Sequence, residues 1–213
     1  MQKRIPDDVI RRLPMYLRQL DELYENGTEL VSSGELCRKL HMDAHQMRSD
    51  LEWFGDFPRR NILYEIDPLR KAIGKILGTD KEFSAVLIGL GKIGSALIEN
   101  FGFIADEYTV LGAFDVSPEL IGTTIAGVPV YDSAALGEFV REHHVDIAIL
   151  TVPRGPAQKL ANVLVESGIR AIWNFTNEDL DVGDADVFIE NVHFSDSLLH
   201  LNYYLARKTD AGA

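Results

Sequence analysis

The sequence predicts an α/β protein in two parts: a small, mainly helical amino-terminal unit and a larger parallel sheet covered by helices. Three observations predict this class. Residues 1–80 carry apolar side chains at helical spacing. From residue 84 onward, short apolar runs alternate with amphipathic segments. The charge is also divided, since residues 1–80 carry a net charge of −1 and the remaining residues carry −11, of −12 in total.

The composition and the charge narrow the class of protein. An arginine-rich, near-neutral amino-terminal part allows a locally basic face, whereas the acidic remainder argues against nucleic-acid binding along the whole chain. The apolar runs are far shorter than the roughly 20 residues that cross a bilayer, and the charged first residues do not resemble a signal peptide. The single cysteine, Cys37, excludes an intramolecular disulfide. We therefore expect a cytoplasmic protein without membrane contact.

The amino-terminal unit is expected to contain helices and one hairpin. The helices are predicted over residues 7–27, 32–42, 43–55 and 67–82, the last starting near Pro68. The predicted caps of the first three are Asp7 or Asp8, Ser32 or Ser33, and Asp43, and the predicted ends of the first and third are Gly27 and Gly55. Residues 56–67 are predicted to form a short extended hairpin that carries Arg59 and Arg60.

The order of these elements, a helix, a helix–turn–helix and a basic hairpin, is typical of a winged-helix domain. In the third helix, the spacing directs Met47, Leu51 and Phe54 inward. The outward positions of this helix are His45, Gln46, Arg48 and Ser49. The same pattern fits a small dimerisation or scaffold unit equally well, so the elements alone leave both interpretations open.

Strands and helices alternate through the rest of the chain. The strands are predicted over residues 84–91, 108–116, 146–153, 170–176 and 186–192. The helices are predicted over residues 93–102, 134–145, 157–168 and 195–208, the last capped by Ser195 or Asp196. Continuous apolar strands separated by helices indicate a Rossmann-type parallel sheet covered on both faces.

The first of these strands runs into the pattern G-x-G-x-x-G at Gly89, Gly91 and Gly94. The first glycine allows a tight turn, the second lets a pyrophosphate approach the backbone, and the third lets the helix pack on the strand. Phosphates would meet exposed amides and the positive end of the helix dipole. Asp115 ends the next strand, where a carboxylate favours NAD(H) over NADP(H). The alternative is a Rossmann-like sheet whose glycines only make a turn.

The sequence offers no clear catalytic group for such a pocket. A dehydrogenase needs a positioned proton donor and a substrate-binding segment, yet only one tail helix follows the sheet. His143 and His144 lie at a charged helix end, and His193 and His200 suit packing or surface roles. No H-E-x-x-H or C-x-x-C pattern indicates a metal site, and Cys37 fits a partly buried thiol. A small NAD-dependent oxidoreductase remains the enzymatic alternative.

Several ordered motifs together resemble one family. They are "IP…RLPMYLRQL", "VSSGELCRKL", "QMRSDLEWFGDF", "GLGKIGSAL", "GAFDVSP", "ILTVPRGPAQ", "GIRAIWNF", "ENVHFSDSL" and "LNYYL". In order and spacing they resemble the Rex family of redox-sensing transcriptional repressors, from about Ile5 to Leu205. Such an ordered set is far more specific than any one of its motifs.

The resemblance implies a homodimer whose tail helix is exchanged between subunits. The implied domains are a winged-helix DNA-binding domain (1–80), a Rossmann NAD(H)-binding domain (81–194) and a carboxyl-terminal helix (195–213). The winged helices would bind a palindromic operator in double-stranded DNA, and the sheet would bind NADH or NAD+. NADH would favour a closed dimer that releases DNA, whereas NAD+ would permit binding. Such a protein is a repressor and not an enzyme.

The resemblance also assigns roles to residues of this chain. The residues expected to hold the dinucleotide are Gly89, Leu90, Gly91, Lys92, Ile93, Gly94 and Asp115. Those expected on the nicotinamide side are Thr151, Val152, Pro153, Asn174 and Phe175. Those expected to contact DNA are His45, Gln46, Arg48 and Ser49 in the recognition helix and Arg59 and Arg60 in the wing. Arginines there suit phosphate or minor-groove contacts, and Gln46 suits a base edge.

The chain departs from the family pattern in its DNA-binding part. Ser49 replaces a usual lysine, and Glu52 and His45 replace small residues. The lost cation and the added carboxylate predict weaker DNA binding with a lower salt dependence. Glycines of the wing are replaced by Pro58, Asn61 and Leu63, which predicts a stiffer hairpin.

Two further departures lie in the nucleotide-binding part. Lys92 replaces a usual asparagine, and its charge is expected to attract phosphate. His193 replaces an aspartate that is tied to the family's switching. These departures leave open a second hypothesis, a diverged regulator with an altered response to DNA or to the cofactor.

Overall fold

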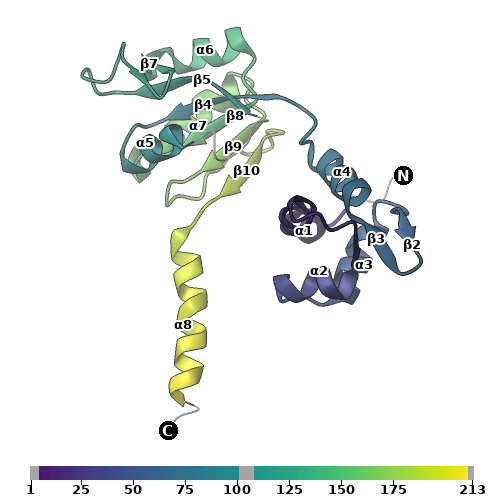
Figure 1. The fold of residues 1–213 in the computed structure, drawn as a ribbon. Coiled ribbons are helices and arrows are strands. Elements are labelled where there is room, and N and C mark those ends of the chain that lie inside the picture. The colour runs from purple at the N-terminus through teal and green to yellow at the C-terminus, as the bar shows by residue number, and fades with distance from the viewer. Residues whose placement is uncertain (1–4, 101–107, 211–213) are drawn as a thin grey trace. The chain divides into compact units, whose positions relative to one another are not determined.

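The protein divides into two compact units, Met1–Lys81 and Glu82–Ala213, each with its own hydrophobic core. The computed structural model describes residues 5–100 and 108–210, and Figure 1 shows its elements. Among the described helices, none is both long enough and apolar enough to cross a membrane. The carboxyl end of the helix predicted over residues 93–102 lies outside the described residues.

The first unit is a winged helix, as the sequence predicts (Figure 1). Its helices are α1 (Asp7–Glu25), α2 (Ser33–Leu40), α3 (Ala44–Glu52) and α4 (Ile66–Leu77). Its strands, in the spatial order β1-β3-β2, are β1 (Leu30–Ser32), β2 (Arg59–Arg60) and β3 (Leu63–Glu65). The pairing of β2 with β3 confirms the predicted hairpin. The pattern does not predict β1, because a strand of three residues is too short to show alternation.

A single core holds these helices together. Its buried side chains include Leu13, Tyr16 and Leu20 from α1, Leu36 from α2, Met47 and Leu51 from α3, and Ile66, Leu69 and Ile73 from α4. Met47 and Leu51 therefore point inward as predicted, and Phe54 packs against the same core. Since this face of α3 is buried, the opposite face is held toward solvent.

In the first unit, the helix caps agree with the sequence in two cases and differ in one. The Ser32 hydroxyl accepts a hydrogen bond from the Glu35 amide at 3.1 Å, and Asp43 accepts one from the His45 amide at 2.9 Å. The predicted cap of α1 by Asp7 or Asp8 is wrong, because the extended residue before the helix is Pro6. Both aspartates instead lie in the first turn, where their charge interacts favourably with the helix dipole.

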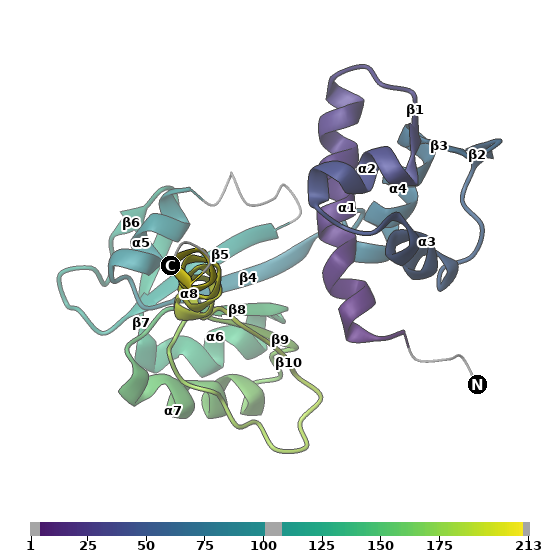
Figure 2. The same ribbon diagram turned by 90° about the horizontal axis from the view of Figure 1, so that it is seen from below.

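The second unit is a seven-stranded sheet with helices on both faces (Figure 2). Its strands are β4 (Phe83–Ile88), β5 (Tyr108–Asp115), β6 (Thr124–Ile125), β7 (Val128–Asp132), β8 (Ile147–Leu150), β9 (Ala171–Asn174) and β10 (Phe188–Asn191). Its helices are α5 (Lys92–Glu99), the 3₁₀ turn η2 (Ser133–Ala135), α6 (Leu136–His143), α7 (Arg154–Glu166) and α8 (Phe194–Asp210). The strand order is β10-β9-β8-β4-β5-β7-β6, and only β6 runs antiparallel to its neighbour.

The sheet has one core on each face. Residues of α6 and α7 pack on one face, including Val140, Ala161 and Leu164. On the other face, Ile98 of α5 packs against Leu87 of β4. The strand β4 is central, with β5 on one side and β8 on the other. This is the point where the strand order reverses, and ligands of such sheets bind there, beyond the carboxyl ends of the strands.

The hairpin of β6 and β7 is not predicted by the sequence pattern. Its turn is made by Ala126 and Gly127, both with positive φ (48° and 85°). β6 has only two residues, and in β7 the apolar residues Val128 and Val130 are separated by Pro129, so neither strand shows the continuous apolar run that identifies the parallel strands.

The last helix, α8, extends from the end of β10 (yellow in Figure 1). The predicted cap by Ser195 or Asp196 is wrong, because α8 already includes Phe194 and both residues lie in its first turn. Large apolar side chains along α8 are exposed to between 55% and 63%: Phe194, Leu198, Leu199, Leu201, Tyr203, Tyr204 and Leu205. An apolar helix left in water is a surface that another polypeptide normally covers.

Candidate functional sites

A pocket of about 890 Å³ lies at the carboxyl ends of β4, β5 and β8. Its size is within the range of roughly 300–1,000 Å³ that is usual for sites of small ligands. The predicted residues that line it are Gly89, Gly91, Lys92, Ile93, Asp115, Thr151, Val152, Pro153 and Phe175. Nine of the twelve residues predicted to hold the cofactor therefore surround one cavity.

The three glycines of the pocket occupy distinct environments. Gly89 has φ +95°, and a Cβ there would lie 2.9 Å from the Val152 side chain. A Cβ on Gly94 would lie 1.9 Å from the Gly89 carbonyl oxygen, so only glycine lets α5 pack this closely on the turn. A Cβ on Gly91 would meet nothing within 4 Å. The backbone at Gly91 is thus open toward the pocket, as a bound pyrophosphate requires.

Asp115 lines the pocket and also holds the glycine turn in place. Its Oδ2 accepts a hydrogen bond from the Leu90 amide at 2.6 Å. Its Oδ1 accepts hydrogen bonds from the Val116 and Ser117 amides, both at 2.8 Å. The backbone thereby fixes the orientation of the carboxylate and keeps its negative charge beside the cavity.

Two helices begin at the pocket without a side-chain cap among the described residues. Gly91 precedes α5 and Pro153 precedes α7, and the side chain of neither residue caps its helix. Amides of the first turns therefore lack intrahelical partners and favour an anion. The basic side chains of Lys92, Arg154 and Lys159 line the same cavity. The sequence pattern does not predict Arg154 or Lys159 as pocket residues, although Arg154 directly follows the strand predicted over residues 146–153.

Three of the residues predicted to hold the cofactor lie outside the lining of this pocket. Leu90, Gly94 and Asn174 do not line the pocket. Leu90 is buried in the core on the α5 face, and Gly94 is covered by the turn.

Asn174 is completely buried and hydrogen-bonded within the sheet unit. Its amide nitrogen donates to the Glu178 carbonyl oxygen and to Asn191 Oδ1, both at 2.8 Å. Its amide oxygen accepts from the Thr176 backbone amide at 3.0 Å. These bonds satisfy the amide and tie β9 to β10 and to the loop between them, so Asn174 supports the pocket wall from behind.

The described part of the chain shows no metal site, and its histidines and cysteine have other surroundings. It contains no group of three or more histidine, cysteine or acidic residues placed to hold a metal ion. The His143 ring stacks on Phe139, with ring centroids 3.9 Å apart. His193 Nε2 lies 3.5 Å from an Asp179 oxygen, outside the pocket lining. Burial raises the pKa of the Cys37 thiol, as expected for a structural cysteine.

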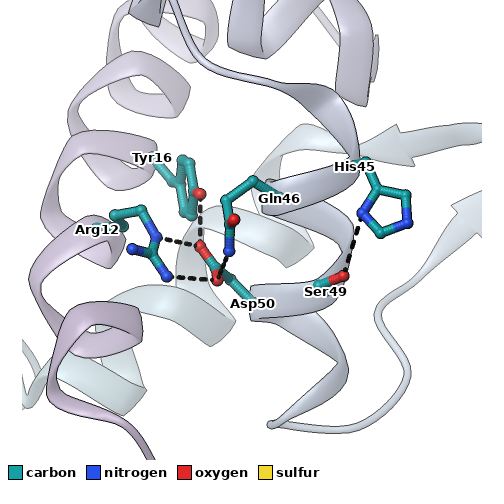
Figure 3. A network of polar contacts seen from close by, with 6 residues as sticks. All are labelled: Arg12, Tyr16, His45, Gln46, Ser49 and Asp50. Carbon is teal, nitrogen blue, oxygen red and sulfur yellow. Dashed lines mark hydrogen bonds and ion pairs between the residues drawn. The ribbon is translucent and has the colours of Figure 1, made fainter.

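A second candidate site is the exposed face of α3 in the first unit. His45, Gln46 and Arg48 are exposed and Ser49 is half-buried. Arg48 Nη1 donates to the Ser33 hydroxyl of α2 at 2.9 Å. His45 Nδ1 and Ser49 Oγ are 3.5 Å apart, one turn from each other along α3 (Figure 3).

A buried polar network lies behind this face (Figure 3). Asp50, only 1% exposed, accepts hydrogen bonds from Arg12 Nε at 2.6 Å and from the Tyr16 hydroxyl at 2.7 Å. Gln46 Nε2 also donates to it, at 2.9 Å. Burial alone would raise the pKa of Asp50, but these hydrogen bonds lower it below the usual value. Burial and the bond to Asp50 raise the pKa of Tyr16.

The sequence pattern marks Asp50 only weakly. It is an acidic residue between the inward positions Met47 and Leu51, and a buried carboxylate needs donors. The donors Arg12 and Tyr16 belong to α1, and only the tertiary fold brings them to α3.

The wing carries two arginines with partners inside the hairpin. The Arg59 guanidinium lies over the Tyr64 ring, 4.5 Å from its centroid. Arg60 Nε pairs with Glu65 at 3.0 Å. Asn61, one of the replaced glycines, has φ +59° and so keeps the left-handed backbone that glycine usually supplies.

Family models match the amino-terminal part of the chain and most of the sheet unit. A family model described as "CoA binding domain" matches residues 80–178, and one described as "Putative DNA-binding protein N-terminus" matches residues 4–52. A redox-sensing transcriptional repressor Rex from Caldanaerobacter subterraneus subsp. tengcongensis is 43% identical over 197 residues, 92% of this chain and 88% of that protein. The chain belongs to the Rex family. A Rex repressor from Clostridium perfringens is 42% identical over 203 residues, 95% of each chain.

Solved Rex structures have the same fold. The crystal structure of RSP, a Rex-family repressor, matches with a TM-score of 0.90 and 40% identity over 97% of each chain. The structure of RSP with β-NADH matches with a TM-score of 0.89 and 39% identity over 97% of each chain. The structure of RSP with β-NAD+ and operator DNA matches with a TM-score of 0.90 and 40% identity, covering 97% of this chain and 95% of that one.

Proposed function

We propose that this chain is a cytoplasmic transcriptional repressor that binds a palindromic operator as a homodimer and is released from it by NADH. Residues 1–80 would be the DNA-binding domain, residues 81–194 the NAD(H)-binding domain and residues 195–213 the dimerising helix. The observation that carries the proposal is the pocket beyond β4, where open backbone at Gly91 lies beside two uncapped helix starts.

The pocket residues fit a dinucleotide. The amides at the start of α5 and the charges of Lys92 and Arg154 suit the pyrophosphate. The oriented Asp115 carboxylate suits ribose hydroxyls and disfavours a 2′-phosphate. Leu90, Gly94 and Asn174 would shape the site without touching the ligand.

A preference for the reduced cofactor follows from the lining of the other half of the pocket. Thr151, Val152, Pro153 and Phe175 give this side a largely apolar surface. The oxidised nicotinamide ring carries a positive charge and the reduced ring is neutral. An apolar wall, in a pocket that already contains basic side chains, disfavours the charged ring.

The first unit would read DNA through α3 and the wing. A helix of this kind enters the major groove, and a wing contacts the backbone or the minor groove. His45, Gln46, Arg48 and Ser49 would face the groove, and Arg59 and Arg60 would contact phosphates. The exposed Glu52 and the absence of a lysine at position 49 make the electrostatic part of this binding small.

The exposed apolar side chains of α8 support dimerisation through this helix. Seven large side chains along it are more than half exposed in the isolated chain. Exchange of α8 between two subunits would bury them and would bring two sensor units into one assembly. A ligand that prefers one arrangement of the dimer then shifts both winged helices together.

The expected size of the response follows from simple linkage. A tenfold preference of NADH for the DNA-free state corresponds to about 1.4 kcal/mol per site. Two sites in a homodimer would together weaken operator binding by roughly a hundredfold. We propose no catalytic turnover, because the relatives that the chain matches over most of its length are transcriptional repressors.

Selection of bound sequences from random duplex DNA, with and without NADH at fixed salt, tests the proposal. We expect one palindromic sequence to be enriched, and we expect NADH but not NAD+ to release it. Absence of any enriched sequence would refute operator binding, and enrichment that NADH leaves unchanged would refute redox sensing. Steady NADH oxidation with a carbonyl substrate would favour the enzymatic alternative.

A further inference from the structure

A hydrogen bond between Gln46 and Asp50 of α3 links an exposed side chain to a buried one. Gln46 is exposed on the face proposed to enter DNA, and Asp50 is buried one turn later. The Gln46 amide nitrogen donates to Asp50 Oδ1 at 2.9 Å. An exposed side chain that would read bases is therefore attached to a buried carboxylate.

The carboxylate itself is fixed from the opposite side by α1. Arg12 Nε and Nη2 donate to the two Asp50 oxygens at 2.6 and 2.8 Å. The hydroxyl of the fully buried Tyr16 adds a bond of 2.7 Å. Such a bidentate, charge-assisted arrangement leaves the carboxylate little freedom to rotate.

This arrangement decides which way the Gln46 amide faces. A free glutamine can turn its amide by 180° and exchange donor and acceptor. A turn here would place the carbonyl oxygen against the Asp50 carboxylate, and both groups only accept hydrogen bonds. The nitrogen therefore stays on Asp50, with the carbonyl oxygen turned away from the carboxylate (Figure 3). One N–H is engaged, so the side chain can offer DNA one acceptor and one donor.

Adenine is the base that matches this edge. In the major groove it presents the N6 donor beside the N7 acceptor, whereas guanine presents two acceptors. A freely rotating glutamine could give both of its N–H groups to guanine, but Gln46 has only one to give.

We propose that Gln46 reads an adenine in each operator half-site and that Asp50, which does not enter the groove, is the positioning residue that sets this choice. This inference rests on the proposed function, because it requires α3 to lie in the major groove. It assigns base specificity to a network between α1 and α3.

The test is selection from random duplex DNA by the full-length wild type and the variants Gln46→Ala, Asp50→Asn and Asp21→Asn. The wild type is expected to require adenine at one position of each half-site, and Gln46→Ala to lose that requirement. In Asp50→Asn the amide is free to turn, so the preference for adenine over guanine there should fall about tenfold while the other positions stay unchanged. Asp21→Asn is the matched control, because Asp21 pairs with Arg70 of α4 and does not touch α3.

Two measurements on the wild-type fold keep the inference testable if Asp50→Asn does not fold. Replacing the critical adenine by 7-deazaadenine, or by purine without the N6 amine, should weaken wild-type binding about tenfold and leave Gln46→Ala unaffected. In ¹⁵N-glutamine-labelled wild type, one of the two Gln46 side-chain amide protons should exchange more slowly than the other. Equal, rapid exchange of both protons would overturn the role of Asp50.

The outcomes also separate this inference from the proposed function. If the wild type enriches no sequence, operator binding is refuted and this inference with it. If the wild type enriches a palindrome but Gln46→Ala and Asp50→Asn change no base preference, only this inference is overturned. A uniform loss of affinity for all sequences in Asp50→Asn would show a purely structural role and would equally overturn it.

Discussion

The basic side chains of the two binding regions differ in whether they already have partners within the chain. On the DNA-facing unit, Arg48 bonds to Ser33, Arg59 lies over Tyr64 and Arg60 pairs with Glu65. At the pocket, two helices begin without a side-chain cap, and no described carboxylate forms a salt bridge with Lys92 or Arg154.

Because of this difference, operator binding should be the easier of the two binding reactions to regulate. A dinucleotide meets donors and charges that are already in place, so its binding requires little rearrangement. DNA must compete with internal partners of the wing, and each exchange reduces the net gain. The net free energy of operator binding should therefore be small. A ligand that shifts it by a few kcal/mol can then control the binding.

The largest expected effect comes from closing the pocket turn. Gly94→Val would place a side chain where even a Cβ lies 1.9 Å from the Gly89 carbonyl oxygen. We expect the sheet unit to lose at least about 3 kcal/mol of stability and NADH binding to fall more than about a hundredfold. Calorimetry of unfolding and NADH titration measure the two effects.

Gly155→Ala is the control for this variant, because a Cβ there meets nothing within 4 Å. It should bind NADH as the wild type does. Unchanged NADH affinity in Gly94→Val would show that the turn is not part of the site.

The next largest effect concerns the buried network of the first unit. Tyr16→Phe removes one donor from the buried Asp50 and should destabilise this unit by about 1–2 kcal/mol. Since the folded pKa of Asp50 is lowered, its stabilisation is present above the unfolded pKa, near about 4, and is lost as the pH falls through the folded pKa.

Loss of the Tyr16 bond raises the folded pKa of Asp50, so acid unfolding of Tyr16→Phe should begin at a higher pH than in the wild type. Unfolding followed by circular dichroism between pH 2 and about 7 measures this shift. Identical acid limbs in both proteins would show that Tyr16 does not stabilise the ionised carboxylate.

A smaller effect is expected from the basic groups of the pocket. Lys92→Ala and Arg154→Ala should each weaken NADH binding about three- to tenfold, because each removes a charge placed near the pyrophosphate. Arg170→Ala is the control, since Arg170 pairs with Asp146 at 2.8 Å and does not line the pocket. Equal losses in all three variants would indicate a general charge effect and not a local contact.

The smallest effect is expected in the wing. It tests whether an internal partner of a wing arginine weakens DNA binding. Glu65→Gln frees Arg60 and is expected to strengthen operator binding two- to threefold and to steepen its salt dependence by about one phosphate contact. Binding isotherms at several salt concentrations measure both quantities. Asp67→Asn, which changes a carboxylate paired with Lys71 of α4, should leave the salt slope unchanged.

The sequence predicts both folds and most of the pocket because their signals are local. Gly89, Gly91 and Asp115 follow strand ends, and strand ends meet at one edge of a parallel sheet. Arg154 and Lys159 are not predicted as pocket residues, because no sequence motif marks the first turns of α7. The buried hydrogen bonds of Asn174 are not predicted, because a polar residue at a strand end can bond to its own sheet as well as to a ligand.

The network around Asp50 is beyond prediction from the sequence for a different reason. Its members Arg12, Gln46 and Asp50 are separated by up to 38 positions along the chain. Neither helical periodicity nor a motif relates the first residue to the other two. Only the packing of α1 against the helix–turn–helix reveals that a buried carboxylate lies behind the exposed glutamine.

In the proposed repressor, NADH binding and operator binding oppose one another. By linkage, operator DNA must weaken NADH binding by the same factor by which NADH weakens operator binding. The most direct measurement is calorimetric titration of the dimer with NADH, at one salt concentration, in the absence and in the presence of saturating operator duplex. Operator DNA is expected to weaken NADH binding about tenfold per site and to leave NAD+ binding nearly unchanged. An NADH affinity that is the same with and without operator DNA would contradict it.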